Sequence, residues 1–334
     1  PKEGEEEIIE DKGNENKVKY RKVEANPMAK EIEEHELDHA VFKDWCPHCV
    51  KGKSVAYPHL KNKGKESEIP IIAIDYMFML TDKKESIGEG GEEEKGMPTL
   101  VIKDSQSKMM FARVVPEKGV YPYVVVRLAA DIRSLGYRKL IIKSDNEASI
   151  KALKEAARNE LEAEVIMEEA AVGDHAGNGV AESSIRQVQG QFRAMKSALE
   201  ERYKSKINGE HQCIPWLMAH AAATFNRRRR DESGMTAYRR WKGRDFNRFI
   251  AEFGENVMYL KADSAGKEKF GYRWERGIYL CTRDKSGEGI IGTPDGVVRA
   301  KDFRRIGLID QRWCREELDA FNGVPWEPVP GRPG

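Results

Sequence analysis

IPIIAIDYMFML, residues 69–80, is an apolar run broken by a single charged residue, Asp75. A short run of this kind between polar segments is typical of a strand buried inside a sheet. An unpaired carboxylate in such a strand is costly to bury, so something must compensate its charge. The run therefore predicts a central strand and marks Asp75 as a candidate functional acid.

The segments that follow this run alternate between strand and helix patterns. Residues 99–115 are predicted to form two strands joined by a turn at 104–108. Further strands are predicted at 139–146 and 162–168, and helices at 121–137 and 147–160. The first of these helices ends at Gly136, a typical C-cap residue. Three strands followed by alternating helix and strand predict an α/β fold, with a mixed sheet flanked by helices.

The remainder of the chain predicts smaller units around that sheet, because a single core seldom grows to 334 residues. Long helices at 179–205 and 214–228 precede short strands and glycine turns, which are typical of a small antiparallel β-barrel. The expected divisions are an acidic, disordered or weakly helical lead-in at 1–34, a His/Cys segment at 35–62, the sheet-containing core at 66–208, a helical basic extension at 209–250, the barrel at 251–308 and a tail at 309–334.

Charge and cysteine content narrow the class of protein. The net charge is only +1, but residues 178–250 carry 15 Lys or Arg against 7 Asp or Glu, a local excess of +8. Five cysteines in a chain of this length do not indicate a secreted disulfide framework. No apolar run is long enough to span a bilayer, and no signal pattern is present. We expect a soluble intracellular protein without a membrane partner, cut from a longer polypeptide because the sequence begins at Pro1.

Two further acids are expected to lie near Asp75. Asp145 ends the strand at 139–146, at a sheet edge where α/β folds present ligands. Glu182 opens the long helix three residues before an apolar stripe, which predicts that it lies on or beside the inward face. Converging carboxylates stay ionised only with cations between them, and paired Mg²⁺ or Mn²⁺ ions would support phosphodiester transfer. Alternatives that spacing does not exclude are Glu147, Glu168, Asp174 and His175.

The order and spacing of these acids resemble a known family. Asp75 and Asp145 are separated by 69 residues, and 36 more precede Glu182. This is similar to the DDE triad of retroviral and retrotransposon integrases, whose core is an RNase H-like sheet. SDN at 144–146 resembles the second-aspartate motif, and NGVAESSIRQVQGQFRAM at 178–195 resembles the copia-type helix that carries the glutamate.

The resemblance continues beyond the core and covers roughly residues 35–306. The copia-type segment that follows the core is similar to three stretches of this chain, FNRRR, GMTAYRRWKGR and FGENVMYL. The family's terminal small barrel is similar to the stretch that begins with ERGIYL and ends with VVRAKDF. Three features depart from the family. Glu147 stands where Gly is usual, Ser183 where Arg is common, and the insertion at 81–98 is longer than the usual connection.

A compact His/Cys patch precedes the sheet. His35 and His39 are four residues apart, which predicts one face of a helix, and Cys46 and Cys49 form a C-x2-C pair. Together they offer four tetrahedral Zn²⁺ ligands, and the family's N-terminal module uses the same order. Only six residues separate His39 from Cys46, which would exclude the family's usual three-helix module. His48 and His59 are alternative ligands.

Basic residues on the two long helices are candidates for DNA contacts, because phosphates are bound by such cations. They are Arg186, Arg193 and Lys196 on the first helix, and Arg227, Arg228, Arg229 and Arg230 at the end of the second. The cluster at 227–230 could instead stabilise its helix C-terminus or serve as a localisation signal.

The resemblance implies a retrotransposon integrase, a polynucleotidyl transferase that trims DNA 3′ ends and joins them to target DNA. In that case Asp75, Asp145 and Glu182 would be catalytic and would bind Mg²⁺ or Mn²⁺. The implied partners are element and target DNA, further copies of the chain and other parts of a retroelement polyprotein, with a nuclear location. Two alternatives remain open: a decayed or domesticated integrase that binds DNA without catalysis, and an RNase H-like nuclease.

Overall fold

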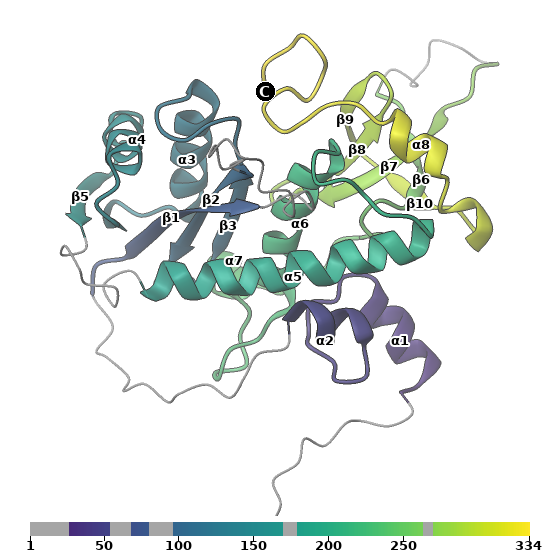
Figure 1. Cartoon of the computed structure of the whole chain (residues 1–334), viewed down its shortest axis with the longest axis horizontal. Helices are drawn as coiled ribbons and strands as arrows, with labels where there is room; N and C mark the ends of the chain where they lie inside the picture. The colour runs from purple at the N-terminus through teal and green to yellow at the C-terminus, as the bar shows by residue number, and fades with distance from the viewer. Residues whose placement is uncertain (1–26, 54–67, 80–95, 170–178, 263–269) are drawn as a thin grey trace, which may run out of the picture.

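The computed structural model of the chain describes residues 27–53, 68–79, 96–169, 179–262 and 270–334. Its strands form two sheets, a mixed five-stranded sheet and a second five-stranded sheet nearer the C-terminus. Figure 1 shows the long helix α5 (Gly179–Tyr203) between the mixed sheet and the N-terminal helices. None of the described helices is long and apolar enough to cross a membrane.

The mixed sheet has the strand order β3-β2-β1-β4-β5. The strands are β1 (Ile71–Met79), β2 (Met97–Asp104), β3 (Met110–Val114), β4 (Lys139–Ser144) and β5 (Glu164–Glu169). β1, β2 and β3 pair antiparallel, whereas β4 lies parallel to β1 and β5 parallel to β4. The predicted mixed, RNase H-like sheet is confirmed, and the apolar run at 69–80 supplies its central strand.

Helices α3 (Pro122–Leu135) and α4 (Ala148–Asn159) cover one face of this sheet (Figure 1). Ile72, Ile74 and Tyr76 of β1 belong to the hydrophobic core on that side. As predicted, α3 ends at Gly136, whose φ of 79° is in the left-handed region that glycine adopts without strain.

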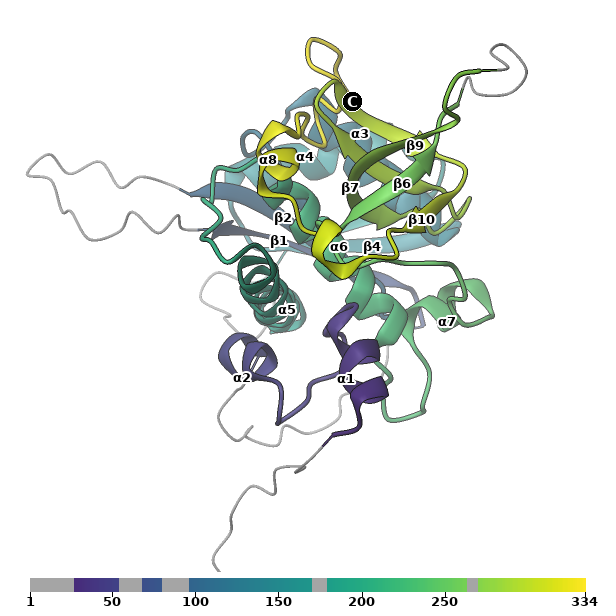
Figure 2. The same ribbon diagram turned by 90° about the vertical axis from the view of Figure 1, so that its right-hand side faces the viewer.

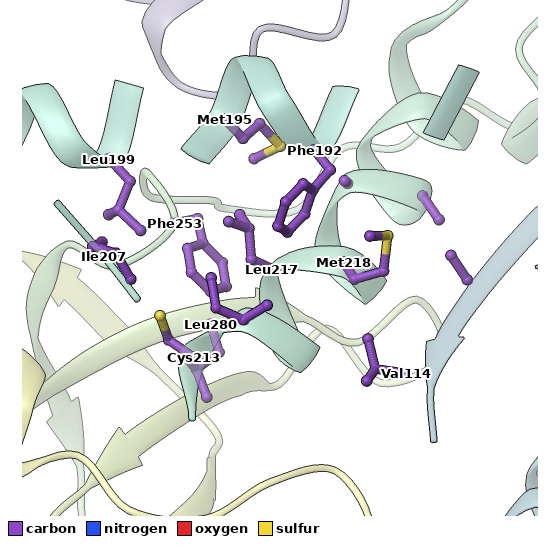
Figure 3. Close-up of a cluster of buried hydrophobic side chains, with 14 of the residues drawn as sticks. Val114, Phe192, Met195, Leu199, Ile207, Cys213, Leu217, Met218, Phe253 and Leu280 are labelled. Atoms are coloured by element: carbon purple, nitrogen blue, oxygen red, sulfur yellow. The ribbon is translucent and has the colours of Figure 1, made fainter. Parts of the chain in front are cut away.

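The opposite face is covered by α5 and α6 (Cys213–Arg228). Met77 and Val101 of the sheet belong to the same core as Phe192 of α5. This core continues to Phe253 and Leu280, which Figure 3 shows close to side chains of α5 and α6. The mixed sheet and the C-terminal sheet are therefore joined through one continuous hydrophobic core rather than by a bare linker.

The C-terminal sheet is antiparallel, with the order β10-β6-β7-β8-β9. Its strands are β6 (Asn256–Leu260), β7 (Trp274–Thr282), β8 (Gly289–Thr293), β9 (Gly296–Ala300) and β10 (Phe303–Arg305). Short helices lie before and after it: α7 (Ala237–Lys242), η1 (Ile309–Gln311) and α8 (Arg315–Ala320). β10 follows β9 in the chain but pairs with β6, so β10 and β9 are the two edges of this sheet. The predicted small β-barrel corresponds to this antiparallel sheet.

The N-terminal helix α2 (Pro47–Lys53) packs on α5, and α1 (Ala29–Glu36) is tied to α5 by an ion pair of 2.8 Å between Glu36 and Arg202. Figure 2 looks nearly along α5 and shows it between the sheets and α2. A Cβ atom on Gly52 would lie 2.5 Å from the backbone nitrogen of Ala194, and one on Gly190 would lie 3.0 Å from the Gly52 carbonyl oxygen. Glycine at both positions therefore lets the backbones of α2 and α5 come into contact.

Candidate functional site

Asp75 lies in the middle of β1 and faces α5. Its strand neighbours Ile74 and Tyr76 belong to the core on the α3/α4 side, whereas Met77 belongs to the core beneath α5. Because side chains alternate along a strand, Asp75 points to the same side as Met77. The carboxylate is half-buried, and its Oδ1 accepts a hydrogen bond of 2.7 Å from the Tyr76 amide.

Asp145 follows β4 directly and comes level with Asp75. In the parallel pairing of β1 with β4, Ala73 lies opposite Lys143. Two residues further along each chain are Asp75 and Asp145, just beyond the last recorded pair of these strands. The topology thus brings the two predicted aspartates to one edge of the sheet, although 69 residues separate them in the sequence.

Glu182 lies in the first turn of α5 and is exposed. Of the two predicted positions, on or beside the inward face, it takes the second, because the buried residues of this part of the helix are Ala181 and Ser184. Their small side chains let α5 approach the sheet closely, and Glu182 is left at the margin of the contact. Ser183, beside it, accepts a hydrogen bond of 3.1 Å from Gln187 one turn later.

Burial raises the pKa of Asp75 to about 6, and the charges of three neighbouring carboxylates act in the same direction. These neighbours are Asp145, Glu147 and Glu182. The hydrogen bond from the Tyr76 amide opposes the shift without cancelling it. The predicted acids are therefore close enough for their charges to act on one another, and the ionised state of Asp75 is disfavoured.

We expect Asp75→Asn to stabilise the metal-free fold near pH 8. The pKa of Asp75 is about 6 in the folded protein, above the ordinary 3.8. The contribution of this group to stability is therefore fully present below about pH 4, and it is lost as the pH rises through 6 and the carboxylate ionises. Discounting for the half-exposed side chain leaves about 1–2 kcal/mol, or about 2–5 °C in Tm. Thermal unfolding without added Mg²⁺ at pH 8 and pH 4 measures the effect.

The exposed Asp310 provides the matched control, since Asp310→Asn makes the same chemical change far from the carboxylates. Its effect on Tm should not depend on pH in this way. A variant Asp75→Asn that destabilises the protein equally at both pH values would contradict the raised pKa of Asp75.

The alternative acids differ in their surroundings. The Glu147 carboxylate accepts hydrogen bonds from Lys118 at 2.7 and 2.9 Å. Glu168, on β5, lies 2.7 Å from the Lys143 ammonium. Asp174 and His175 lie outside the described residues, as does the insertion at 81–98 up to residue 95.

The four predicted zinc ligands, by contrast, form a tight buried cluster. One ligand atom from each of His35, His39, Cys46 and Cys49 lies within 4.8 Å of all the others. The two histidine nitrogens are 3.2 Å apart, and three nitrogen–sulfur distances are 3.4, 3.5 and 3.9 Å. Tetrahedral Zn²⁺ with ordinary Zn–N and Zn–S bonds has edges of about 3.3–3.8 Å. The donor set and its spacing therefore fit zinc.

The local backbone that forms this cluster differs from the predicted helix face. α1 ends at Glu36, and His39 lies beyond it with a φ of 48°, in the left-handed region. Its amide still donates to the His35 carbonyl at 2.9 Å, which brings the two rings together. A hydrogen bond from Cys49 and others from the two histidines lower the pKa of Cys46 well below its usual range, towards the thiolate that zinc binds.

His48 is not a member of the cluster. Its two ring nitrogens lie 2.8 Å from the Ser197 hydroxyl and 2.9 Å from the Glu201 carboxylate, both on α5. The other alternative ligand, His59, lies outside the described residues. Within the described part of the chain, no other group of three or more His, Cys, Asp or Glu is gathered tightly enough to hold an ion.

The basic residues predicted on α5 have different environments. Arg186 is exposed one turn after Glu182. Arg193 donates to the Gly52 carbonyl at 3.2 and 3.3 Å, and Lys196 lies 2.7 Å from Glu200. The first is open to a phosphate, whereas the other two already bind groups of the same chain.

The cluster at 227–230 is divided in the same way. Arg227 is buried, and its guanidinium bonds Asp284 at 2.9 Å and the Thr282 carbonyl, with the Phe246 ring 4.2 Å away. It cannot reach DNA without losing these contacts. The exposed members are Arg228, 2.7 Å from Asp38, Arg229, over the Phe225 ring, and Arg230, 2.7 Å from the Gly234 carbonyl.

Arg227→Ala is expected to destabilise the protein by about 2–4 kcal/mol, since it leaves a carboxylate and a buried carbonyl without their partner. Arg230→Ala, at the exposed end of the same cluster, should change stability by less than about 0.5 kcal/mol. Chemical denaturation of both variants tests this. If Arg227→Ala kept full stability and lost affinity for DNA, the structural role would be wrong.

No protein-family model and no curated protein matches the chain. Among solved structures, it is similar to a chain of the cryo-EM structure of the simian T-cell lymphotropic virus intasome in complex with PP2A regulatory subunit B56 gamma. The similarity covers 78% of this chain and 87% of that chain, with 12% sequence identity and a TM-score of 0.40. At this level it says nothing about function.

Proposed function

We propose that this chain is an integrase-type polynucleotidyl transferase that processes DNA 3′ ends and joins them to target DNA. The observation that supports the proposal is the parallel register of β1 and β4, which brings Asp75 and Asp145 level at one end of the RNase H-like sheet. The charges of Asp145 and Glu182 both act on Asp75 there. Mutually repelling carboxylates beside an open surface call for bound cations.

The three carboxylates suit Mg²⁺ or Mn²⁺, which prefer oxygen ligands. When bound, a pair of such ions would activate the attacking oxygen and stabilise the leaving one. Asp75 and Asp145 would hold their positions through the sheet, and Glu182 would approach from α5. The described carboxylates are not gathered as tightly as the His/Cys cluster. Binding would therefore include an inward turn of the exposed Glu182 side chain.

Arg186 would position DNA at this site. Residues four apart lie on one side of a helix, so Arg186 and Glu182 face the same way. An exposed guanidinium one turn from the carboxylates can bind a phosphate of the DNA strand that reacts. The bound phosphate would bring the scissile bond close to Asp75 and Asp145, and the protein would contribute position and charge more than covalent chemistry.

Origin and assembly belong to the same proposal. The copia-type motifs quoted above support a retrotransposon source, hence nuclear DNA, further copies of the chain and polyprotein segments as partners. Zinc at the His/Cys cluster would fix α1 and α2 on α5, because all four ligands are buried beside that helix.

A second candidate is a decayed integrase that binds DNA without catalysis. Two observations favour it: the looser grouping of the carboxylates, and the use of Ser183, where the family commonly has Arg, in a bond to Gln187. An RNase H-like nuclease is the third, and it would cleave without joining.

The test is an assay of the full chain on duplex oligonucleotides that carry the element's ends, with supercoiled plasmid as target. Mg²⁺- or Mn²⁺-dependent trimming followed by joined products is expected. Cleavage without joined products would identify a nuclease. DNA binding with neither reaction, and no divalent-ion binding, would identify the decayed integrase.

A further inference from the structure

Lys118, in the loop between β3 and α3, is fixed beside the carboxylate site. Its ammonium lies 2.7 and 2.9 Å from the two carboxylate oxygens of Glu147. It also lies over the rings of Tyr76 and Phe78, 5.2 and 4.7 Å from their centroids. An anion on one side and two aromatic faces on the other hold this cation in one place.

Glu147 is held at the same place from a second direction. The Ser149 hydroxyl donates to its Oε1 at 2.6 Å, and the Glu147 backbone is the N-cap of α4. Its amide donates to Oδ1 of Asp145 at 3.3 Å, so it is a direct neighbour of a proposed metal ligand. A fourth carboxylate thus stands next to the triad, with its charge directed to Lys118.

The two faces of β1 separate this ion pair from the proposed metal site. Tyr76, beneath the Lys118 ammonium, belongs to the core on the α3/α4 side, whereas Asp75 points to the α5 side. Lys118 therefore draws the Glu147 carboxylate towards the face of the sheet that Asp75 does not occupy.

We infer that Lys118 is a positioning residue that keeps Glu147 out of the divalent-metal site. The inference rests on the proposed function, since it concerns the ions held by Asp75, Asp145 and Glu182. Without the ammonium, the Glu147 carboxylate could turn towards the ions and occupy a coordination position that water or a DNA oxygen needs. Two residues from Asp145, it is close enough to do so.

Electrostatics support the same assignment. The Glu147 amide donates to the Asp145 carboxylate, so the charge of Glu147 lies close to the site even while it is paired with Lys118. The ammonium offsets part of that charge at short range. Removing either partner alone should therefore change the affinity of the site for a dication, in opposite directions.

The experiment measures Mn²⁺ binding to the full, zinc-loaded chain by electron paramagnetic resonance, with Lys118→Met, Glu147→Gln, the double variant and Lys118→Arg. Lys118→Met should raise Mn²⁺ affinity by about three- to tenfold, and Glu147→Gln should lower it by about the same factor. The double variant should match Glu147→Gln to within about twofold, because Lys118 acts through Glu147, and Lys118→Arg should stay within about twofold of wild type. At saturating metal, Lys118→Met should still lose about tenfold in kcat for strand transfer, because the extra ligand blocks a position.

Lys151→Met is the matched control, because Lys151 on α4 forms an ion pair of 2.9 Å with Glu169 on β5. It should leave Mn²⁺ affinity unchanged. If Lys118→Met had the same effect in the Glu147→Gln background as in wild type, the two residues would act independently and the inference would be overturned. A Lys118→Met variant with unchanged affinity and kcat would also overturn it.

Failure of the proposed function gives a different result. If Asp145→Asn bound as much Mn²⁺ as wild type, the proposed metal site would be absent. If Asp145→Asn removed the bound Mn²⁺ and Lys118→Met had no effect, only the role of Lys118 would be wrong. Thermal unfolding of each variant confirms that the fold persists, and Lys118→Arg separates lost charge from lost packing.

Discussion

Asp145→Asn is expected to reduce Mg²⁺-dependent strand transfer at least about a thousandfold, a loss of about 4 kcal/mol in transition-state stabilisation. The amide keeps the size of the side chain but removes a charged metal ligand at the edge of the sheet. Because Asp145 is level with Asp75 across the β1–β4 pair, no other described strand residue replaces it there. Gel assays of 3′ trimming and joining, with wild type at equal concentration, measure the loss.

The fold should survive this change, since one of several mutually repelling charges is removed. DNA affinity should stay within about threefold of wild type, because cations rather than carboxylates bind phosphates. Asp310→Asn, at an exposed site, should retain full activity. Strand transfer that persists in Asp145→Asn would remove Asp145 from the triad and with it the proposed use of paired metals.

The fold was predictable from the sequence where burial leaves a local pattern. Strand β1 (Ile71–Met79), within the apolar run at 69–80, packs against a core on each face of the sheet, so most of its residues are apolar. Gly136 ended α3 for a reason that is visible in the sequence, since glycine readily adopts the left-handed conformation of a C-cap. Such signals depend on neighbouring residues alone.

The orientation of α5 was predictable except in its first turn. The apolar stripe is buried at Val188, Phe192, Met195 and Leu199. Nearer the start of the helix Ile185 is only partly buried, while the small residues Ala181 and Ser184 are buried. Small residues pack closely against a sheet but carry little hydrophobic signal. In the first turn the buried face is therefore formed by small residues that the apolar stripe does not include, and Glu182 lies exposed beside it.

Long-range ion pairs leave no mark on the sequence. Arg227 was expected to face DNA with its three neighbours, but its partner Asp284 is 57 residues away on the C-terminal sheet side. Lys118 was missed altogether, because its partner Glu147 is 29 residues away and lies on a different element. Charge counts identify a basic segment, but only the tertiary fold decides which of its cations face solvent.

Loss of zinc is expected to release the N-terminal segment from α5. The four ligands are buried. His35 lies in α1 and Cys49 in α2, while His39 and Cys46 lie in the segment between these two short helices, which have little core of their own. Structural zinc sites of this kind bind with about 10–16 kcal/mol, and much of that energy is folding energy. We expect one Zn²⁺ per chain by elemental analysis and none in Cys49→Ser, whose N-terminal amides should exchange with solvent at least about 100-fold faster.

Cys314→Ser is the control, since Cys314 is only partly buried and its thiol bonds Glu316, far from the cluster in the sequence. It should keep its zinc and its exchange rates. In Cys49→Ser the core that joins α5, α6 and the two sheets should stay protected, because the zinc ligands are not part of it. Faster exchange confined to the segment 27–53 would show that zinc holds this segment on α5. Unchanged exchange there would show that the packing of Gly52 against Gly190 alone holds the segment in place.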